Sequence, residues 1–94
     1  MMKKYELYYI IDASASEEQR EALINKISDL VTKNGGTIDG LNREGLKKFA
    51  YPINFKTEGF YVLMNFTADS SLPQQMEKQM LIMDYYVRGL FLAK

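Results

Sequence analysis

Apolar and polar residues alternate along several stretches of the chain, a period of two that is typical of strands with one buried face. These stretches are rich in aromatic and β-branched residues, and polar segments separate them. They predict strands over Tyr5–Ile11, Thr37–Leu41 continuing past a bend at Gly45 into Leu46–Ile53, Phe60–Phe66, and Tyr85–Ala93. Residues 54–59 are expected to form a polar turn. Pro52 has no amide hydrogen, so the second strand is expected to lie at a sheet edge or to end there.

Two other stretches repeat apolar residues at helical spacing. The first helix is expected to open between Ser14 and Ser16, where two capping boxes overlap, and to end at Asn34-Gly35-Gly36. The second is expected to begin near Ser70-Ser71, with Pro73 in its first turn, and to end in Leu81-Ile82-Met83. The apolar stripes are Leu23, Ile24, Ile27, Leu30 and Val31 in the first helix, and Met76, Met80 and Met83 in the second.

The order β-α-β-β-α-β predicts a ferredoxin-like α+β fold in one domain over residues 1–94. Right-handed crossovers place both helices on one face of a four-stranded antiparallel sheet. The other face is uncovered, and its large apolar residues predict a contact surface for another protein. Alternation places on it Tyr8, Ile10, Tyr61, Leu63, Leu90 and Leu92, with Tyr86 and Arg88 on the same face of the last strand. The alternative is that the faces of one strand are exchanged, because a register slip of one residue inverts them.

Charge and composition narrow the possible functions. The chain has 12 Lys and Arg against 12 Asp and Glu, so binding to nucleic acid requires a local basic surface. It has no cysteine and no histidine, which removes disulfides, thiolate catalysis and the commonest general base. No apolar run approaches the roughly 18 residues of a membrane span, and the short N-terminal run lacks a cleavage site. These observations favour a cytoplasmic protein without catalytic activity, metal or cofactor.

Basic residues are concentrated in the second predicted strand and the turn that follows it. Residues 43–56 carry four cations, Arg43, Lys47, Lys48 and Lys56, against the single anion Glu44. Lysines on an edge strand discourage pairing with other sheets, and that role explains these residues as well as phosphate binding does. The aromatic residues beside the lysines are compatible with stacking on unpaired bases and equally with burial. The residues alone leave both alternatives open.

The segment GLKKFAYPI, from Gly45 to Ile53, resembles the LG-x-R/K-x-LAYPI segment of the bacterial ribosomal protein S6 family. The resemblance extends over essentially the whole chain. Its other matches are Lys4-Tyr5-Glu6, Gly35, Gly59-Phe60-Tyr61, Asp84, Val87 and Arg88. It implies a ferredoxin-like protein of the small ribosomal subunit with no enzymatic activity and no cofactor. It also implies binding to the central domain of small-subunit ribosomal RNA together with ribosomal protein S18.

The resemblance further indicates which residues contact RNA. The basic pair of the motif falls on Lys47 and Lys48, and Tyr51 is expected to pack and set the path of the segment. The expected phosphate contacts are Lys3, Lys4, Arg43, Lys47, Lys48 and Arg88. The uncovered sheet face is the expected surface for the protein partner.

The chain departs from the family pattern at several positions. Relatives often have arginine where this chain has Lys47 or Lys48, and lysine cannot make a bidentate phosphate contact. Glu44 stands at a commonly apolar position, and residues 81–83 lack a basic residue that relatives often carry. In a protein without net charge, these departures predict that RNA affinity depends strongly on the protein partner.

Two other classes of function are compatible with the fold. A small-ligand regulatory domain would need glycines in the loop after the first strand, and residues 12–16 contain none. An acylphosphatase-like enzyme would need an arginine in that loop, whereas Arg20 lies within the predicted helix.

Overall fold

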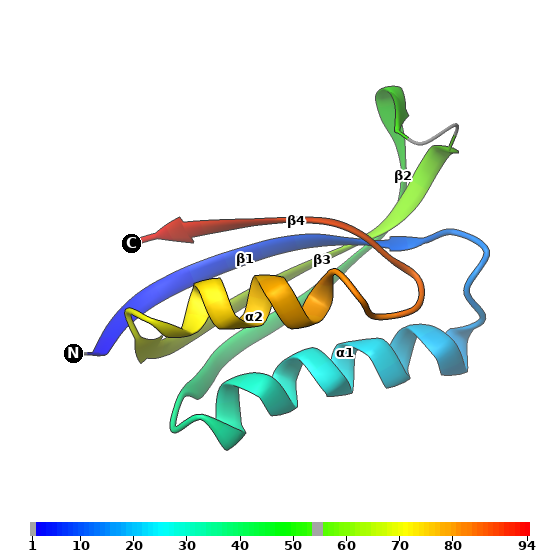
Figure 1. The fold of residues 1–94 in the computed structure, drawn as a ribbon. Coiled ribbons are helices and arrows are strands. Elements are labelled where there is room, and N and C mark those ends of the chain that lie inside the picture. The colour runs from blue at the N-terminus through cyan, green and yellow to red at the C-terminus, as the bar shows by residue number, and fades with distance from the viewer. Residues whose placement is uncertain (1, 54–55) are drawn as a thin grey trace.

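The computed structural model describes residues 2–53 and 56–94, with the side chains of residues 2–48 and 58–94 (Figure 1). The elements follow the predicted order: β1 Met2–Asp12, α1 Glu17–Lys33, β2 Thr37–Ile53, β3 Lys56–Asp69, α2 Leu72–Met80 and β4 Tyr86–Ala93. The strands pair in the order β2-β3-β1-β4, and every pairing is antiparallel. Both helices lie on one face of this sheet (Figure 1). The predicted ferredoxin-like fold is therefore confirmed.

Helix α1 begins and ends at its sequence signals. The Ser16 hydroxyl accepts a hydrogen bond from the Gln19 amide at 3.2 Å, and the Ser16 amide donates to the Gln19 side chain at 2.8 Å. This reciprocal pair is the capping box, and it satisfies amides that a helix start otherwise leaves open. At the other end Gly35 has a φ of +82°, a left-handed conformation that glycine adopts without a side-chain clash.

The hydrophobic core lies between the sheet and the two helices. Its fully or almost fully buried residues are Leu7, Tyr9 and Ile11 of β1, Val62, Met64 and Phe66 of β3, Leu23, Ile24, Ile27 and Val31 of α1, and Leu72, Met76 and Met80 of α2. Burying a large apolar side chain contributes about 1.5–3 kcal/mol, so this face of the sheet supplies most of the stability. The predicted apolar stripe of α1 is confirmed, with Leu30 only partly buried, and Met76 and Met80 of α2 are buried as predicted.

Strands β2 and β3 form a long hairpin that extends past the end of β1 (Figure 1). β1 ends at Asp12, opposite Gly59, whereas the last paired residues of the hairpin are Ile53 and Lys56. β3 therefore begins at Lys56, and the turn expected over residues 54–59 is wrong at its C-terminal end. Pairing with β2 continues there and keeps those residues extended.

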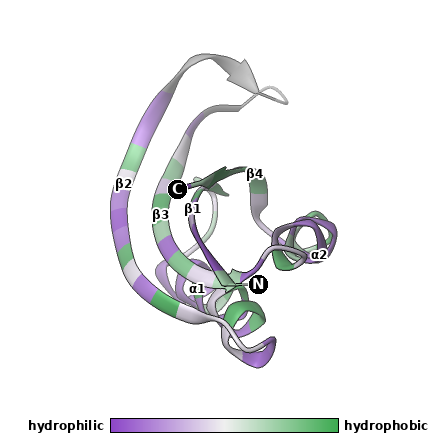
Figure 2. Ribbon diagram, turned by 90° about the vertical axis from the view of Figure 1, so that its left-hand side faces the viewer, coloured by the Kyte–Doolittle hydropathy of each residue, from purple (hydrophilic) through white to green (hydrophobic). Residues whose placement is uncertain are grey.

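The bend expected at Gly45 is confirmed. The pairing of β2 with β3 shifts between Arg43 and Gly45, and Gly45 has a φ of +96°, which favours glycine. β2 is an edge strand, as expected for the strand that contains Pro52, although the side chain of Pro52 lies outside the described residues. Figure 2 shows that hydrophilic residues recur along this edge, an arrangement that discourages pairing with another sheet.

Helix α2 is shorter than expected. It ends at Met80, because the Met83 amide donates to the Met80 carbonyl at 3.0 Å and closes a turn. Leu81 and Ile82 thus lie outside the helix, with 66% and 85% of their surface exposed. The extension of the helix to Met83 that the methionine spacing predicts is wrong.

A bulge in β4 changes one predicted face. Tyr86 lies opposite Ile11, but Arg88 lies opposite Ile10, so one extra residue stands between Tyr86 and Arg88. Tyr86 therefore packs on the helix-covered side, and the expectation that it shares a face with Arg88 is wrong. Gly89 makes room for this ring, because a Cβ at that position would collide with the Tyr86 hydroxyl.

Candidate partner-protein and nucleic-acid surfaces

The uncovered face of the sheet carries the apolar residues expected on it. Strand register brings together Tyr8, Ile10, Tyr61, Leu63, Leu90 and Leu92. Tyr8 lies between Leu63 of β3 and Leu90 of β4. Exposure is greatest on β4, where Leu90 is 58% and Leu92 46% exposed, whereas Ile10 is only 8% exposed. The centre of the face is thus apolar and is most accessible along its β4 edge.

A hollow of about 300 Å³ lies in this face beside β4. It is lined by Tyr8, Ile10, Arg88, Gly89 and Leu90. The resemblance assigns Arg88 to RNA and its apolar neighbours to a protein partner, but the structure brings both sets together around one hollow. An apolar depression with a single cation can receive an anchoring side chain from a partner.

Polar side chains of β1 and β2 contact one another on the same face of the sheet, near the end of β1. The Tyr8 hydroxyl donates to Glu44 Oε1 at 2.7 Å, and Lys47 Nζ donates to the same oxygen at 3.2 Å. Lys47 Nζ also lies 5.6 Å from the centroid of the Tyr61 ring, in a cation–π contact. The hydrogen bond from Tyr8, followed by that from Lys47, lowers the pKa of Glu44, and Glu44 in turn raises the pKa of Lys47. Lys47 is therefore held charged over an aromatic surface.

The three cations of β2 with described side chains point to different sides of the sheet. Lys47 lies on the uncovered side with Tyr61, so strand alternation places Lys48 on the helix-covered side. Arg43 is also on the helix-covered side, where it donates to both carboxylate oxygens of Glu21 at 2.7 and 2.8 Å. The bidentate contact raises the pKa of Arg43 and lowers that of Glu21. Lys48 is exposed and makes no ion pair with any of the side chains that the structure describes.

The remaining expected RNA contacts, Lys3 and Lys4, lie at the opposite end of β1 and are exposed. A strand rises about 3.3 Å per residue, so Lys4 is about 20 Å from Ile10 and its neighbour Arg88. The six predicted cations therefore do not form one patch. Lys94, which the sequence does not single out, joins Lys4, because its amide donates to the Lys4 carbonyl at 2.9 Å. The return of the last strand to the start of the first is the signal that could have identified it.

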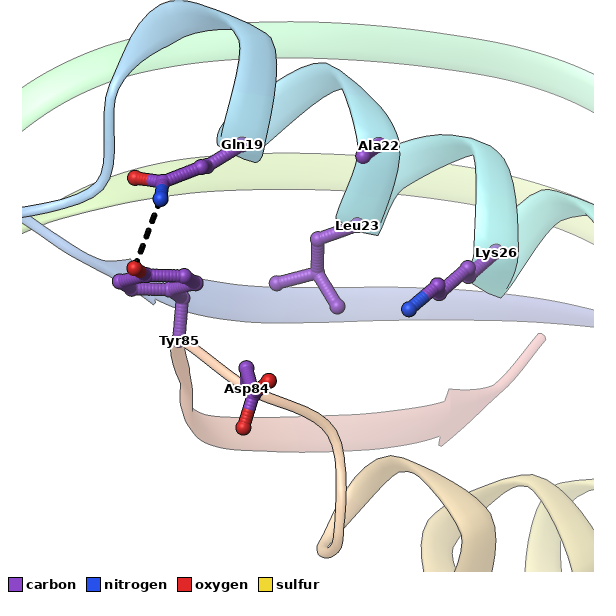
Figure 3. A pocket seen from close by; sticks show the side chains of 6 residues that line it. All are labelled: Gln19, Ala22, Leu23, Lys26, Asp84 and Tyr85. Atoms are coloured by element: carbon purple, nitrogen blue, oxygen red, sulfur yellow. Dashed lines mark hydrogen bonds between the residues drawn. The ribbon is translucent and has the colours of Figure 1, made fainter.

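A second pocket, of about 180 Å³, lies between α1 and the segment that leads into β4 (Figure 3). It is lined by Gln19, Ala22, Leu23, Lys26, Asp84 and Tyr85. Gln19 Nε2 donates to the Tyr85 hydroxyl at 2.8 Å, which holds a tyrosine whose φ is +69°. The lining contains no nucleophile beside a base, so this pocket points to no reaction.

Within residues 2–53 and 56–94, no group of three or more acidic side chains is placed to hold a metal ion. Over the same residues, neither helix has the length and apolar character needed to cross a membrane.

The fold and the uncovered face together define a class of protein: a ferredoxin-like α+β protein in which large apolar side chains are exposed on the face of the sheet that the helices do not cover. The family described as ribosomal protein S6 matches residues 4–93. The small ribosomal subunit protein bS6 of Exiguobacterium sibiricum is 42% identical over 87 residues, which cover 93% of this chain and 92% of that protein. The bS6 protein of Thermoanaerobacter pseudethanolicus is 42% identical over 91 residues, covering 97% and 96% of the two chains.

A similar solved structure is the crystal structure of 30S ribosomal protein S6 from Thermotoga maritima. It superposes with a TM-score of 0.93 at 28% sequence identity, covering 100% of this chain and 89% of that chain. The chain belongs to the ribosomal protein S6 family, and the resemblance carried by GLKKFAYPI is confirmed.

Proposed function

We propose that the protein is a non-catalytic, cytoplasmic component of the small ribosomal subunit that binds the central domain of small-subunit ribosomal RNA together with ribosomal protein S18. The observation that carries this proposal is the family match over residues 4–93. The relatives named above are small-subunit proteins, and the geometry of this chain offers one surface suited to a protein and separate cations suited to phosphate.

The uncovered sheet face is the proposed surface for the protein partner. Leu90 and Leu92 expose large apolar side chains on β4, next to the hollow at Arg88. Apolar side chains exposed side by side on a sheet favour contact with another protein, and a hollow among them provides the packed centre of an interface. S18 is the proposed occupant.

The cations are the proposed contacts to RNA phosphates. Lys47 and Lys48 lie on opposite sides of one strand, so the hairpin can meet phosphates on both sides at once. Arg43 is already engaged by Glu21, and a contact between Arg43 and RNA would have to displace that carboxylate. A net charge of zero leaves few cations for RNA, which supports a joint surface with the partner.

The experiment is a titration of central-domain RNA with this protein at several salt concentrations, with and without S18. About four neutralised phosphates give a slope of about −3 to −4 for log affinity against log salt. We expect this slope when the salt dependence measured with S18 alone is subtracted from that of the complex of this protein with S18. We do not expect it for this protein without S18. Binding that ignores S18 and does not respond to salt would overturn the proposal.

A further inference from the structure

Beyond its base, the hairpin formed by β2 and β3 no longer pairs with β1. We define the hairpin base as residues 43–48 of β2 and 58–61 of β3. β1 ends opposite Gly59, and the hairpin continues beyond this point (Figure 1). A two-stranded ribbon by itself is marginally stable and strongly twisted. Lys47 lies opposite Gly59, the last residue of β3 that pairs with β1, and Lys48 lies one residue further along the ribbon, so contacts at the base set the direction in which both are presented.

Helix α1 supplies two such contacts from neighbouring residues, one to each strand. The Arg20 guanidinium lies 4.5 Å from the centroid of the Phe60 ring on β3. Glu21 accepts two hydrogen bonds from Arg43 on β2, at 2.7 and 2.8 Å. Arg20 is itself held by a hydrogen bond to the Ala15 carbonyl at 3.2 Å. The start of α1 thus contacts both strands close to the position where β3 stops pairing with β1.

The opposite side of the hairpin base is held by the bond from Tyr8 to Glu44, which joins β1 to β2 across β3. Contacts on both faces fix a ribbon more firmly than a contact on one face, because they oppose rotation in either direction. The bend at Gly45 lies between them, at the point where the strand changes register.

We propose that Arg20 and Glu21 are positioning residues for RNA binding, which hold the hairpin base so that Lys47 and Lys48 face the phosphates. This role rests on the proposed function. The two residues act through the hairpin and not by touching RNA. If the hairpin samples other directions, the apparent RNA affinity falls by the fraction of molecules that keep the competent one.

The size of the effect follows from exposure. Arg43 and Glu21 are 43% and 41% exposed, and an ion pair of this kind changes an equilibrium by at most about fivefold. Global folding rests mainly on the buried core, and the folding equilibrium changes by no more than the same small factor. The contact between Arg43 and Glu21 therefore acts mainly on the equilibrium between different orientations of the hairpin.

Exchanging the charges of residues 21 and 43 tests whether Arg43 pairs with Glu21 or contacts an RNA phosphate. Glu21→Arg and Arg43→Glu are each expected to weaken binding of central-domain RNA in the presence of S18, by about fivefold. The double variant restores the pair with its charges reversed, and we expect it to bind within about twofold of the native protein. Urea unfolding midpoints should stay close to the native value throughout.

A direct phosphate contact by Arg43 gives the opposite pattern. Glu21→Arg would then strengthen binding by adding a cation, and the double variant would show no recovery through pairing. Either result overturns the positioning role, as does unchanged binding in both single variants. Glu18→Arg is the matched control, since it makes the same change of charge at an exposed position of the same helix, where the native residue pairs with no cation in the described part of the chain.

A second measurement needs no RNA. The chain contains no cysteine, so two introduced cysteines are the sole attachment sites for spin labels. We choose Lys26→Cys on α1 and Glu58→Cys on the hairpin base, both at exposed positions. We expect a narrow distance distribution that broadens when Arg20→Gln and Glu21→Gln are added. An unchanged distribution would overturn the inference. If native protein failed to bind RNA while this broadening occurred, the proposed function would fall and the role of α1 in holding the hairpin would stand.

Discussion

Both faces of the sheet carry large apolar side chains, but they differ in what these side chains do. On the helix-covered face Leu7, Val62 and Phe66 have no exposed surface, whereas on the other face Leu90 is 58% exposed. The same alternation along each strand produces both faces. One face is closed by the chain's own helices and stabilises the fold, and the other is available to a partner. Variants that separate stability from binding test this division.

The largest effect is expected from the closed face. Phe66→Ala removes a buried ring that stacks on Tyr5 at 5.5 Å and meets Phe91 edge-on at 6.4 Å between centroids. Loss of such a side chain destabilises the folded state by about 3–5 kcal/mol. The measurement is the free energy of unfolding in urea. Leu92→Ala on the uncovered face is the control, with an expected change below about 0.5 kcal/mol. Equal losses would mean that both faces are core.

A charged residue on the open face should act on binding instead. Leu90→Asp replaces an exposed apolar side chain of the proposed interface with a carboxylate, and we expect affinity for S18 to fall at least about tenfold while folding is kept. Titration calorimetry measures the affinity. Leu46→Asp is the matched control, because Leu46 is 56% exposed but lies opposite Phe60, on the other side of the sheet. Similar losses in the two variants would place the partner elsewhere.

Removal of two cations from the hairpin should reduce RNA binding more modestly. Lys47→Ala with Lys48→Ala is expected to make the salt slope of the S18 complex shallower by about 1.5, as two phosphate contacts are lost. Lys26→Ala with Lys33→Ala removes the same charge from α1 and should leave the slope unchanged. Loss of folding in the first variant, seen by circular dichroism, would instead assign these lysines to the structure of the edge strand.

The smallest effect concerns Glu44, which links the open face to the hairpin. Tyr8→Phe removes the largest single cause of its lowered pKa, and Lys47→Ala removes both a hydrogen bond and a nearby charge, so each variant should raise the pKa toward the usual 4.5. Carboxyl carbon NMR shifts against pH measure both changes. Because the pKa is lower in the folded than in the unfolded chain, the stability from these contacts is present above pH 4.5 and is lost as the pH falls through the lower folded value. An unchanged pKa in either variant would show that the side chain removed does not favour the charged form of Glu44.

Local signals predicted much of the fold. The capping box at Ser16, the glycine at Gly35 and the bend at Gly45 each act within a few residues, and the structure has all three. The face of Tyr86 was not predictable by alternation, because the bulge depends on the space left by Gly89 and on packing against the helices. Periodicity assumes unbroken pairing and fails where pairing shifts.

The candidate site was predicted less completely. Alternation already implies that adjacent lysines at positions 47 and 48 lie on opposite sides of a strand, and the structure agrees. The pairing of Arg43 with Glu21 joins positions far apart in the sequence, and depends on how α1 lies across β2. Contacts of that kind come from tertiary packing, which neither composition nor spacing contains.

The ion pair between Arg43 and Glu21 has a consequence for any count of ions released on RNA binding. Added salt weakens an exposed pair of this kind, so it would loosen the hairpin while it screens the lysines from phosphate. The measured slope would then include a contribution from a contact within the protein. The number of phosphates inferred from the native protein would exceed the number touched. Neutralising both partners, in Glu21→Gln with Arg43→Gln, removes the pair without changing the net charge, so the difference between its slope and that of the native protein provides the correction.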